Sequence, residues 1–152
     1  MGRPPKYNCN EAYFSNITSD SQAYFLGLIW ADGTMQQGHL RIVLREADDI
    51  LLRTFCKDIE YTGPIYTRTV ADKRYSELTI TRKAIVADLH RIGLTSNKSS
   101  NNAQWPDILP SALPHFMRGL FDGDGSVYQC NLGFAAAICG GYNFLSRVNE
   151  EI

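Results

Sequence analysis

The chain has 152 residues, of which 44% are hydrophobic and 20% charged, so we expect a globular domain of ordinary size with a real core. Its net charge of −1 gives no indication of a nucleic-acid partner. The four cysteines include no C-x-x-C pair and the sequence has no long apolar run, which argues against a structural zinc site, a disulfide framework, export and a membrane span. We therefore expect reduced thiols and no membrane partner.

The basic residues are unevenly distributed along the chain. Residues 1–100 carry 13 Lys and Arg against 11 Asp and Glu, whereas residues 101–152 carry 2 against 5. Any phosphate-binding surface is therefore expected in the first two thirds of the chain.

In chain order, the sequence predicts a basic arm and then a helix, a hairpin, a second helix, a second hairpin and a third helix. The helices are expected at residues 24–33, 48–61 and 83–92, and the strands around residues 40–45, 65–70 and 74–82. Gly93 is expected to end the third helix. In the first strand, Leu40, Ile42 and Leu44 should face the helices, and in the last one Leu78 and Ile80 should do so.

A second, shorter unit follows an irregular Ser-, Asn- and Pro-rich connection. It is predicted to contain a helix at 115–125, a strand at 132–138 and a helix at 142–152, and to lack a second hairpin and a last helix. The expected divisions are an N-terminal arm at 1–12, a first repeat at 13–94, a linker at 95–114 and a partial second repeat at 115–152.

Two segments of the chain match at one offset of 92 residues. Residues 25–33 read FLGLIWADG and residues 117–125 read MRGLFDGDG, which indicates an internal duplication. Each predicted helix carries small residues four apart, Gly27 and Ala31 in the first and Gly119 and Gly123 in the second. Small residues at this spacing let two helix backbones approach closely, so we expect these four to form a helix–helix interface.

Both helices then end in Asp-Gly, with a glycine expected in the left-handed conformation. A carboxylate at a helix C-terminus is destabilising by roughly 0.3–1 kcal/mol, because that end carries partial negative charge. If the helices pair in parallel, Asp32 and Asp124 also repel each other. A divalent cation between them would explain both features, and carboxylate oxygens suit Mg²⁺ (or Mn²⁺) in phosphodiester hydrolysis. The rival interpretation, a calcium loop starting at Asp122, fails because Val127 and Gly133 stand where that loop needs Gly and Glu.

These paired segments resemble the two motifs of a single-chain LAGLIDADG homing endonuclease. The flanking residues 6–14, 93–99 and 105–114 resemble the bacterial and phage branch, and the resemblance covers about residues 6–152. Trp30 replaces the first acidic residue of the motif, at a position that varies in the family.

The resemblance implies an α+β fold, a pseudo-twofold duplicated αββαββα repeat with the second repeat incomplete. It implies a site-specific double-stranded DNA endonuclease with a long target, encoded by a mobile genetic element and active in intron or intein homing. Asp32 and Asp124 would bind the metal and cut the two strands, leaving short 3′ overhangs, and Lys83 (or Arg82) would assist. The protein would be a cytoplasmic monomer with pseudo-dimer symmetry in a bacterial or phage-infected cell, with an organellar location as the alternative.

Polar residues on the face of the sheet away from the helices, and at the hairpin ends, are expected to touch DNA. They are Gln36, Gln37, His39, Arg41, Arg45, Arg68, Thr69, Lys73, Arg74, Tyr75 and Thr79, with Lys98 in the linker as a phosphate contact. Three alternatives stay open at this point. In the first, the chain is a cleavage-deficient relative that binds DNA or intron RNA. In the second, it is a remnant without function. In the third, it self-associates to build a full DNA-binding saddle.

Overall fold

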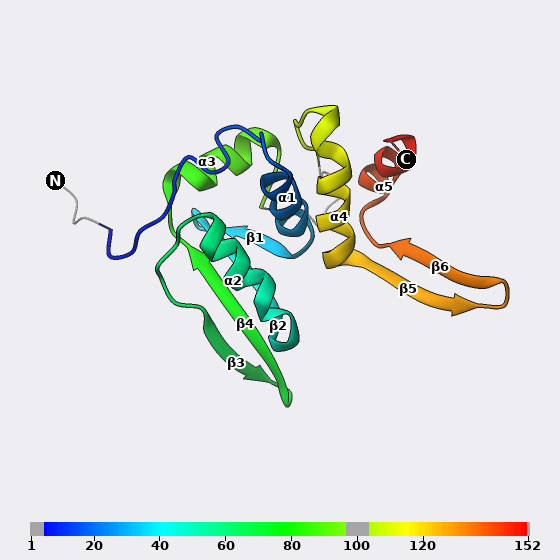
Figure 1. The fold of residues 1–152 in the computed structure, drawn as a ribbon, viewed down its shortest axis with the longest axis horizontal. Helices are drawn as coiled ribbons and strands as arrows, with labels where there is room; N and C mark the ends of the chain where they lie inside the picture. The colour runs from blue at the N-terminus through cyan, green and yellow to red at the C-terminus, as the bar shows by residue number, and fades with distance from the viewer. Residues whose placement is uncertain (1–4, 97–103, 152) are drawn as a thin grey trace.

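The structure is a computed structural model that describes residues 5–96 and 104–151 (Figure 1). The first repeat contains α1 (Asp20–Asp32), β1 (Gly33–Gln36), β2 (His39–Arg45), α2 (Asp49–Asp58), β3 (Tyr66–Val70), β4 (Lys73–Ile80) and α3 (Lys83–Ile92). The second contains α4 (Leu113–Asp124), β5 (Gly125–Cys130), β6 (Gly133–Ile138) and α5 (Tyr142–Glu151). Short 3-10 turns over Glu46–Asp48 and Pro110–Ala112 precede α2 and α4. The predicted α+β fold is confirmed, with αββαββα followed by αββα.

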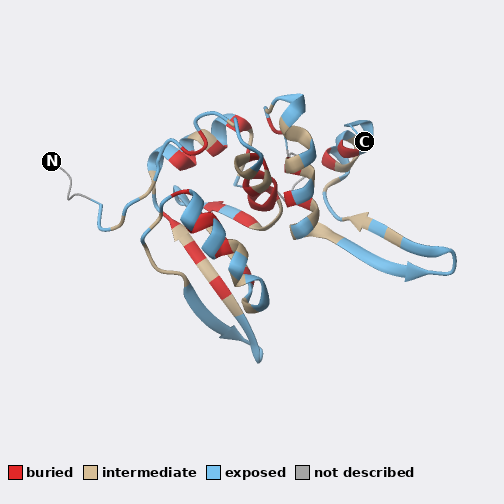
Figure 2. Ribbon diagram, in the orientation of Figure 1, coloured by how far each residue is buried: buried red, intermediate tan, exposed pale blue. Residues whose placement is uncertain are grey.

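A four-stranded antiparallel sheet in the order β1-β2-β4-β3 forms the body of the first repeat. Its predicted inward residues are buried, and Ile42 lies opposite Leu78 while Leu40 lies opposite Ile80 (Figure 2). The first three helices pack against this face. The other face of the sheet is therefore left open to a partner.

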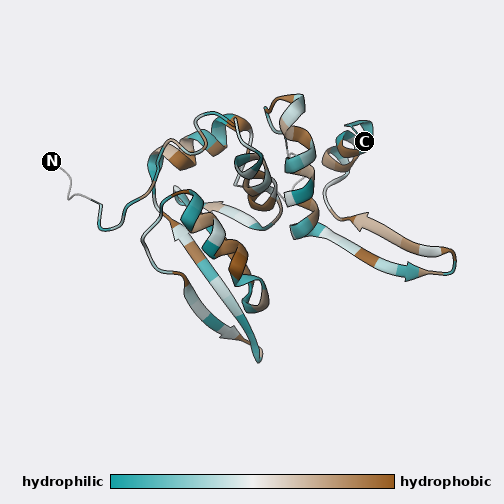
Figure 3. Cartoon of the chain, in the orientation of Figure 1, coloured by the Kyte–Doolittle hydropathy of each residue, from teal (hydrophilic) through white to brown (hydrophobic). Residues whose placement is uncertain are grey.

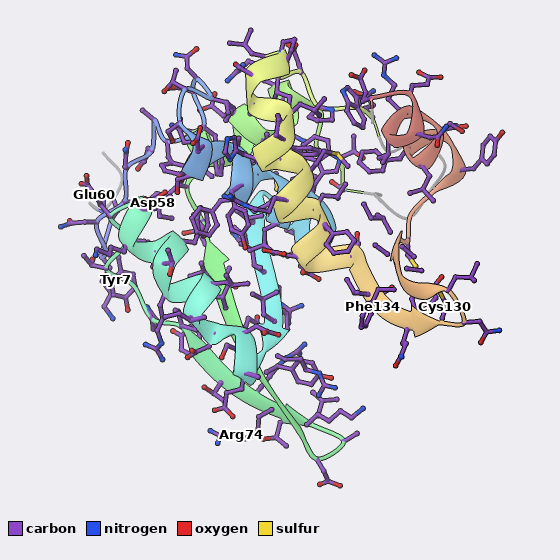
Figure 4. All side chains as sticks on the ribbon, turned by 45° about the vertical axis from the view of Figure 1, so that its right-hand side comes forward. Tyr7, Asp58, Glu60, Arg74, Cys130 and Phe134 are labelled. Carbon is purple, nitrogen blue, oxygen red and sulfur yellow. The ribbon has the colours of Figure 1, made fainter. Side chains whose placement is uncertain are left out.

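The hairpin of β5 and β6 extends away from the body of the molecule (Figure 1). Its strands contain no charged residue, and Val127 and Phe134 expose 64% and 80% of their surface. Figure 3 shows the apolar character along β6, and Figure 4 places Phe134 and Cys130 away from the four-stranded sheet. The two repeats thus present chemically different hairpins.

Trp105 connects α5 to the rest of the core. Its ring lies 6.1 Å from that of Phe116 on α4 and 5.6 Å from that of Phe144 on α5. These contacts bury the apolar face of α5, which the small two-stranded sheet would otherwise cover alone. No helix of the described residues has the length and apolar character that crossing a membrane needs.

Helices α1 and α4 pack along each other through their backbones. A Cβ atom on Gly27 would overlap the carbonyl oxygen of Phe116, and one on Gly119 would overlap the carbonyl oxygen of Tyr24. These two contacts are related by the same offset of 92 residues, so the pair has local twofold symmetry. Further along, Gly123 lies against Ala31. Because later residues of α1 meet later residues of α4, the helices are parallel and their C-termini lie at one end.

The glycines that follow the two helices have a different role from the predicted one. The expected left-handed conformation is wrong, since Gly33 has φ −73° and Gly125 has φ −87°, and both begin strands. A Cβ on Gly33 would lie 2.6 Å from the carbonyl oxygen of Ile29, and one on Gly125 would overlap that of Phe121. Glycine is needed here for space at a sharp helix-to-strand turn. At Gly93, by contrast, φ is 120°, as a glycine that ends a helix allows.

Substituting Gly27 or Gly119 by alanine should lower the free energy of unfolding by about 1–3 kcal/mol or more, because a backbone carbonyl cannot move aside as a side chain can. Urea denaturation measures this. Gly140→Ala is the matched control, since its Cβ would lie nearest to side-chain atoms, of Leu145 at 3.4 Å and Phe144 at 3.8 Å, and should change stability by less than about 0.5 kcal/mol. Equal midpoints for all three variants would contradict backbone packing of the helix pair.

Candidate functional site

The parallel helices bring Asp32 and Asp124 to the same end of the pair, where each is the last helical residue and is half-buried. The Asp32 carboxylate lies across the partner helix, since its Oδ2 is 2.8 Å from where a Cβ on Gly123 would be. The missing side chain of Gly123 is thus what gives the carboxylate its position. The structure therefore places together the two aspartates that the sequence singled out.

A cavity of about 590 Å³ adjoins this end of the helix pair. Its lining includes the carboxylates of Asp32, Asp48 and Asp122 and one cation, Arg45. The other lining residues are Leu28, Val43, Leu44, Ile50, Leu51, Tyr75 and Gly123. The cavity joins the helix termini to the end of β2, where the open face of the sheet begins.

The two carboxylates at the helix ends have the chemistry that a hard divalent cation needs, because carboxylate oxygens are its preferred protein ligands. Within residues 5–96 and 104–151, no group of three or more His, Cys, Asp or Glu side chains is arranged to hold a metal. A cation here would hence be held by Asp32 and Asp124 and would complete its shell with water and phosphate oxygens.

Arg45 is the basic residue at the cavity, a place for which the sequence favoured Lys83. Its guanidinium lies 5.2 Å from the ring centre of Tyr75, its partner directly across β4. Among the described residues that line the cavity, neither Lys83 nor Arg82 is found. Lys83 is the exposed first residue of α3, and Arg82 donates to the carbonyl oxygen of Tyr7 and lies 3.5 Å from Glu11. The sequence feature that could have identified Arg45 is its position at the end of β2.

Strand register assigns the predicted DNA contacts to the two faces of the sheet. On the open face lie Gln36, His39, Arg41, Arg45, Arg68, Lys73, Tyr75 and Thr79. Thr69 and Arg74 instead share the face of buried Ser76, where Arg74 pairs with Glu46 at 2.8 Å, near the tip of the hairpin in Figure 4. Gln37 occupies the β1–β2 turn with φ 50°, and Lys98 lies outside the described residues.

A carboxylate stands in the middle of the open face. Glu77 accepts from Arg41 through both oxygens, at 2.6 Å from Nε and 2.7 Å from Nη2, and lies 3.4 Å from Nε of Arg68. The hydrogen bonds from Arg41 hold the pKa of Glu77 below its ordinary value. Three neighbouring strands are thereby joined by one charged cluster, which the sequence did not predict because strand register was unknown.

The two sides of the helix interface differ in chemistry. On one side the Tyr24 hydroxyl donates to Asp122 Oδ2 at 2.8 Å, and the Arg118 guanidinium lies 5.0 Å from the Tyr24 ring centre. Burial, reinforced by this hydrogen bond, raises the pKa of Tyr24. At the equivalent positions on the other side, Trp30 and Phe116 pack edge to face at 5.7 Å. Trp30 therefore occupies the position equivalent to Asp122, and its neighbour Phe116 occupies the position equivalent to Tyr24.

His115 also joins the helices, with its Nε2 3.3 Å from Asp20 Oδ1. Neither the Tyr24–Asp122 pair nor this contact could be read from the sequence, because each depends on which turns of α1 and α4 face each other.

Comparison with protein-family models gives no match, and comparison with curated proteins gives none either. Among solved structures, mesophilic variants of the homing endonuclease I-DmoI are similar at 16% identity over 77% of this chain and 61% of that chain, with a TM-score of 0.42. The I-LtrWI LAGLIDADG homing endonuclease bound to target DNA is similar at 13% identity over 84% of this chain and 65% of that chain, with a TM-score of 0.40. The chain thus spans less than two thirds of the length of either structure.

The Arg41–Glu77 pair makes stability depend on pH in one direction. Because the folded pKa of Glu77 is lowered from 4.5, its stabilising effect is present above that value and is lost as pH falls through the folded pKa. Glu77→Gln should be less stable than the parent at pH 7, by on the order of 0.2–1 kcal/mol for a partly exposed pair. The difference, measured by urea denaturation, should shrink below pH 4.5.

The control is the same substitution made together with Arg41→Gln. Without Arg41, Glu77 keeps only Arg68 beside it and should contribute a smaller acid-sensitive part of the stability. A Glu77→Gln difference that stays constant with pH in the parent background would show that the ion pair does not stabilise the sheet.

Proposed function

We propose that this chain is a metal-dependent DNA endonuclease of the LAGLIDADG homing endonuclease type, which hydrolyses phosphodiester bonds at a long double-stranded target. The observation that carries the proposal is the parallel, glycine-packed helix pair that ends in Asp32 and Asp124, with Asp32 lining the adjoining cavity. Each carboxylate lies at a helix C-terminus, an end that carries partial negative charge and therefore disfavours a second negative charge. A cation held between them accounts for both.

In this mechanism each group has one task. Asp32 and Asp124 would hold Mg²⁺ or Mn²⁺, which when bound supplies positive charge for the phosphate and lowers the pKa of a water. Gly123 keeps the carboxylate of Asp32 in place. Arg45 neutralises the negative charge that develops on the phosphate as water adds to phosphorus and the P–O bond breaks.

The open face of the four-stranded sheet is the proposed DNA surface. This face carries four basic residues, Arg41, Arg45, Arg68 and Lys73, and one acidic residue, Glu77. A two-stranded or broader antiparallel ribbon fits the major groove, where arginine can recognise guanine. The cavity borders this face through Arg45 and Tyr75, so DNA bound there would bring a phosphate to the aspartates.

A second candidate is a protein that binds DNA or intron RNA without cutting it. The observation in its favour is the β5–β6 hairpin, which has no charged residue, so the proposed phosphate contacts fall on one repeat. Cleavage in the presence of Mg²⁺ distinguishes the two functions, since binding alone needs neither aspartate.

Selection of cleaved duplexes from a randomised library with Mg²⁺ should recover one long site. Asp32→Asn and Asp124→Asn should each lower cleavage of that site by at least about 100-fold, because each removes a charged metal ligand. Asp107→Asn, which changes an exposed carboxylate outside the cavity, is the control and should cut like the parent.

The outcomes separate the candidates. Specific gel shifts without any metal-dependent product would support the binding protein. Cleavage that survives in both Asp variants would refute the assignment of the active site.

Arg45→Gln should reduce the cleavage rate by roughly 10- to 100-fold at saturating DNA, since it removes a charge from the reacting phosphate. Lys83→Gln is the matched comparison and should have a smaller effect, because Lys83 does not line the cavity. Single-turnover kinetics on the selected duplex measure both. A larger loss in Lys83→Gln would assign the assisting cation to α3.

A further inference from the structure

We infer that Arg41 reads a single guanine from the open sheet face and that Glu77 is the positioning residue that aims it. This inference rests on the proposed DNA binding and assigns individual roles within that surface. It starts from Glu77, the one carboxylate on the open face of the sheet, where four basic residues also lie. For a surface that only attracts phosphates, an acidic residue at this place weakens binding.

The contact between the two side chains fixes the direction of the guanidinium. Nε and Nη2 of Arg41 donate to the two oxygens of Glu77 at 2.6 and 2.7 Å, so the side edge of the planar fork is occupied. The adjacent end edge, formed by Nη1 and the second hydrogen of Nη2, keeps two parallel donors. Guanine presents two acceptors, O6 and N7, in the major groove, and this pairing is the commonest specific contact of arginine.

The surroundings hold this arrangement in place. Arg41 and Glu77 are diagonal neighbours on β2 and β4, and Arg68 on β3 approaches the same carboxylate at 3.4 Å. The side chain of Glu77 is 19% exposed while that of Arg41 is 35% exposed, so the acid is the more covered of the two and part of the Arg41 side chain remains accessible. Since Glu77 already restricts the rotamers of Arg41, less conformational entropy is lost when a base is bound.

The rival role for Glu77 is direct recognition of cytosine through its N4 amino group. Both carboxylate oxygens are already engaged by Arg41, and one of them also faces Arg68. Glu77 is therefore better suited to orient than to read.

The test uses the full chain and the duplex most enriched from a randomised pool by binding in Ca²⁺. Each base pair of that duplex is replaced in turn by the other three, and competition binding gives a preference profile. Arg41→Lys keeps the charge but loses the fork, and should reduce the preference for guanine at one base pair by about 10-fold or more. Glu77→Gln should flatten the profile at that same base pair, while its affinity for unrelated duplex stays equal or increases.

Glu46→Gln is the matched control. It removes the acid of another cross-element ion pair, Arg74–Glu46 at 2.8 Å, on the helix-bearing face of the sheet. It should leave the profile unchanged, and thermal unfolding of each variant confirms that it is folded. Because the readout is base preference at one position, a purely structural ion pair would not produce the expected result.

The outcomes distinguish this inference from the function on which it rests. A Glu77→Gln profile that matches the parent, or changes evenly at all positions, overturns the inference and leaves DNA binding intact. A preference for cytosine lost in Glu77→Gln but kept in Arg41→Lys overturns it in favour of direct reading by the acid. If the parent protein enriches no duplex at all, the proposed function fails and this inference fails with it.

Discussion

The contact between the backbones of α1 and α4 is the constraint on which the rest of the structure depends. At Gly27 and Gly119 no side chain separates the helices, so their axes are held parallel and in one register. This register brings Gly123 against Asp32 and carries both terminal aspartates to one end. The strands that start at Gly33 and Gly125 then leave from that end, and the proposed site and DNA surface are consequences of the same packing.

The twofold symmetry of this helix pair relates the two backbones, but the side chains on the two sides of the interface differ. One side of the interface is polar, with Tyr24 bound to Asp122, and the equivalent side is aromatic, with Trp30 against Phe116. The hairpins diverge further, because the first repeat carries a basic open face and β5–β6 carries no charge. Phosphate contacts in the proposed complex would hence come mainly from the first repeat, even if both aspartates serve the reaction.

The features that depend on residues close together in the sequence were predicted correctly. The alternation of Leu40, Ile42 and Leu44 identified the buried face of β2, and the repeated small residues identified the helix interface. Features that depend on pairing between distant segments were missed. The bond from Arg41 to Glu77 follows from the register of β2 on β4, and the role of Arg45 follows from a cavity shared by several elements. The extended conformation of Gly33 was missed because a glycine after a helix was expected to end it in the left-handed conformation, whereas here the chain turns directly into β1.

Paramagnetic broadening by Mn²⁺ tests most directly whether the helix pair builds one cation site. In the parent protein, substoichiometric Mn²⁺ should broaden the backbone amide signals of Gly33 and Gly125 together, because each follows one of the two aspartates. Asp32→Asn and Asp124→Asn should each weaken the broadening at both glycines. Broadening at only one glycine, or at neither, would contradict the claim that the parallel packing of α1 and α4 unites the two carboxylates.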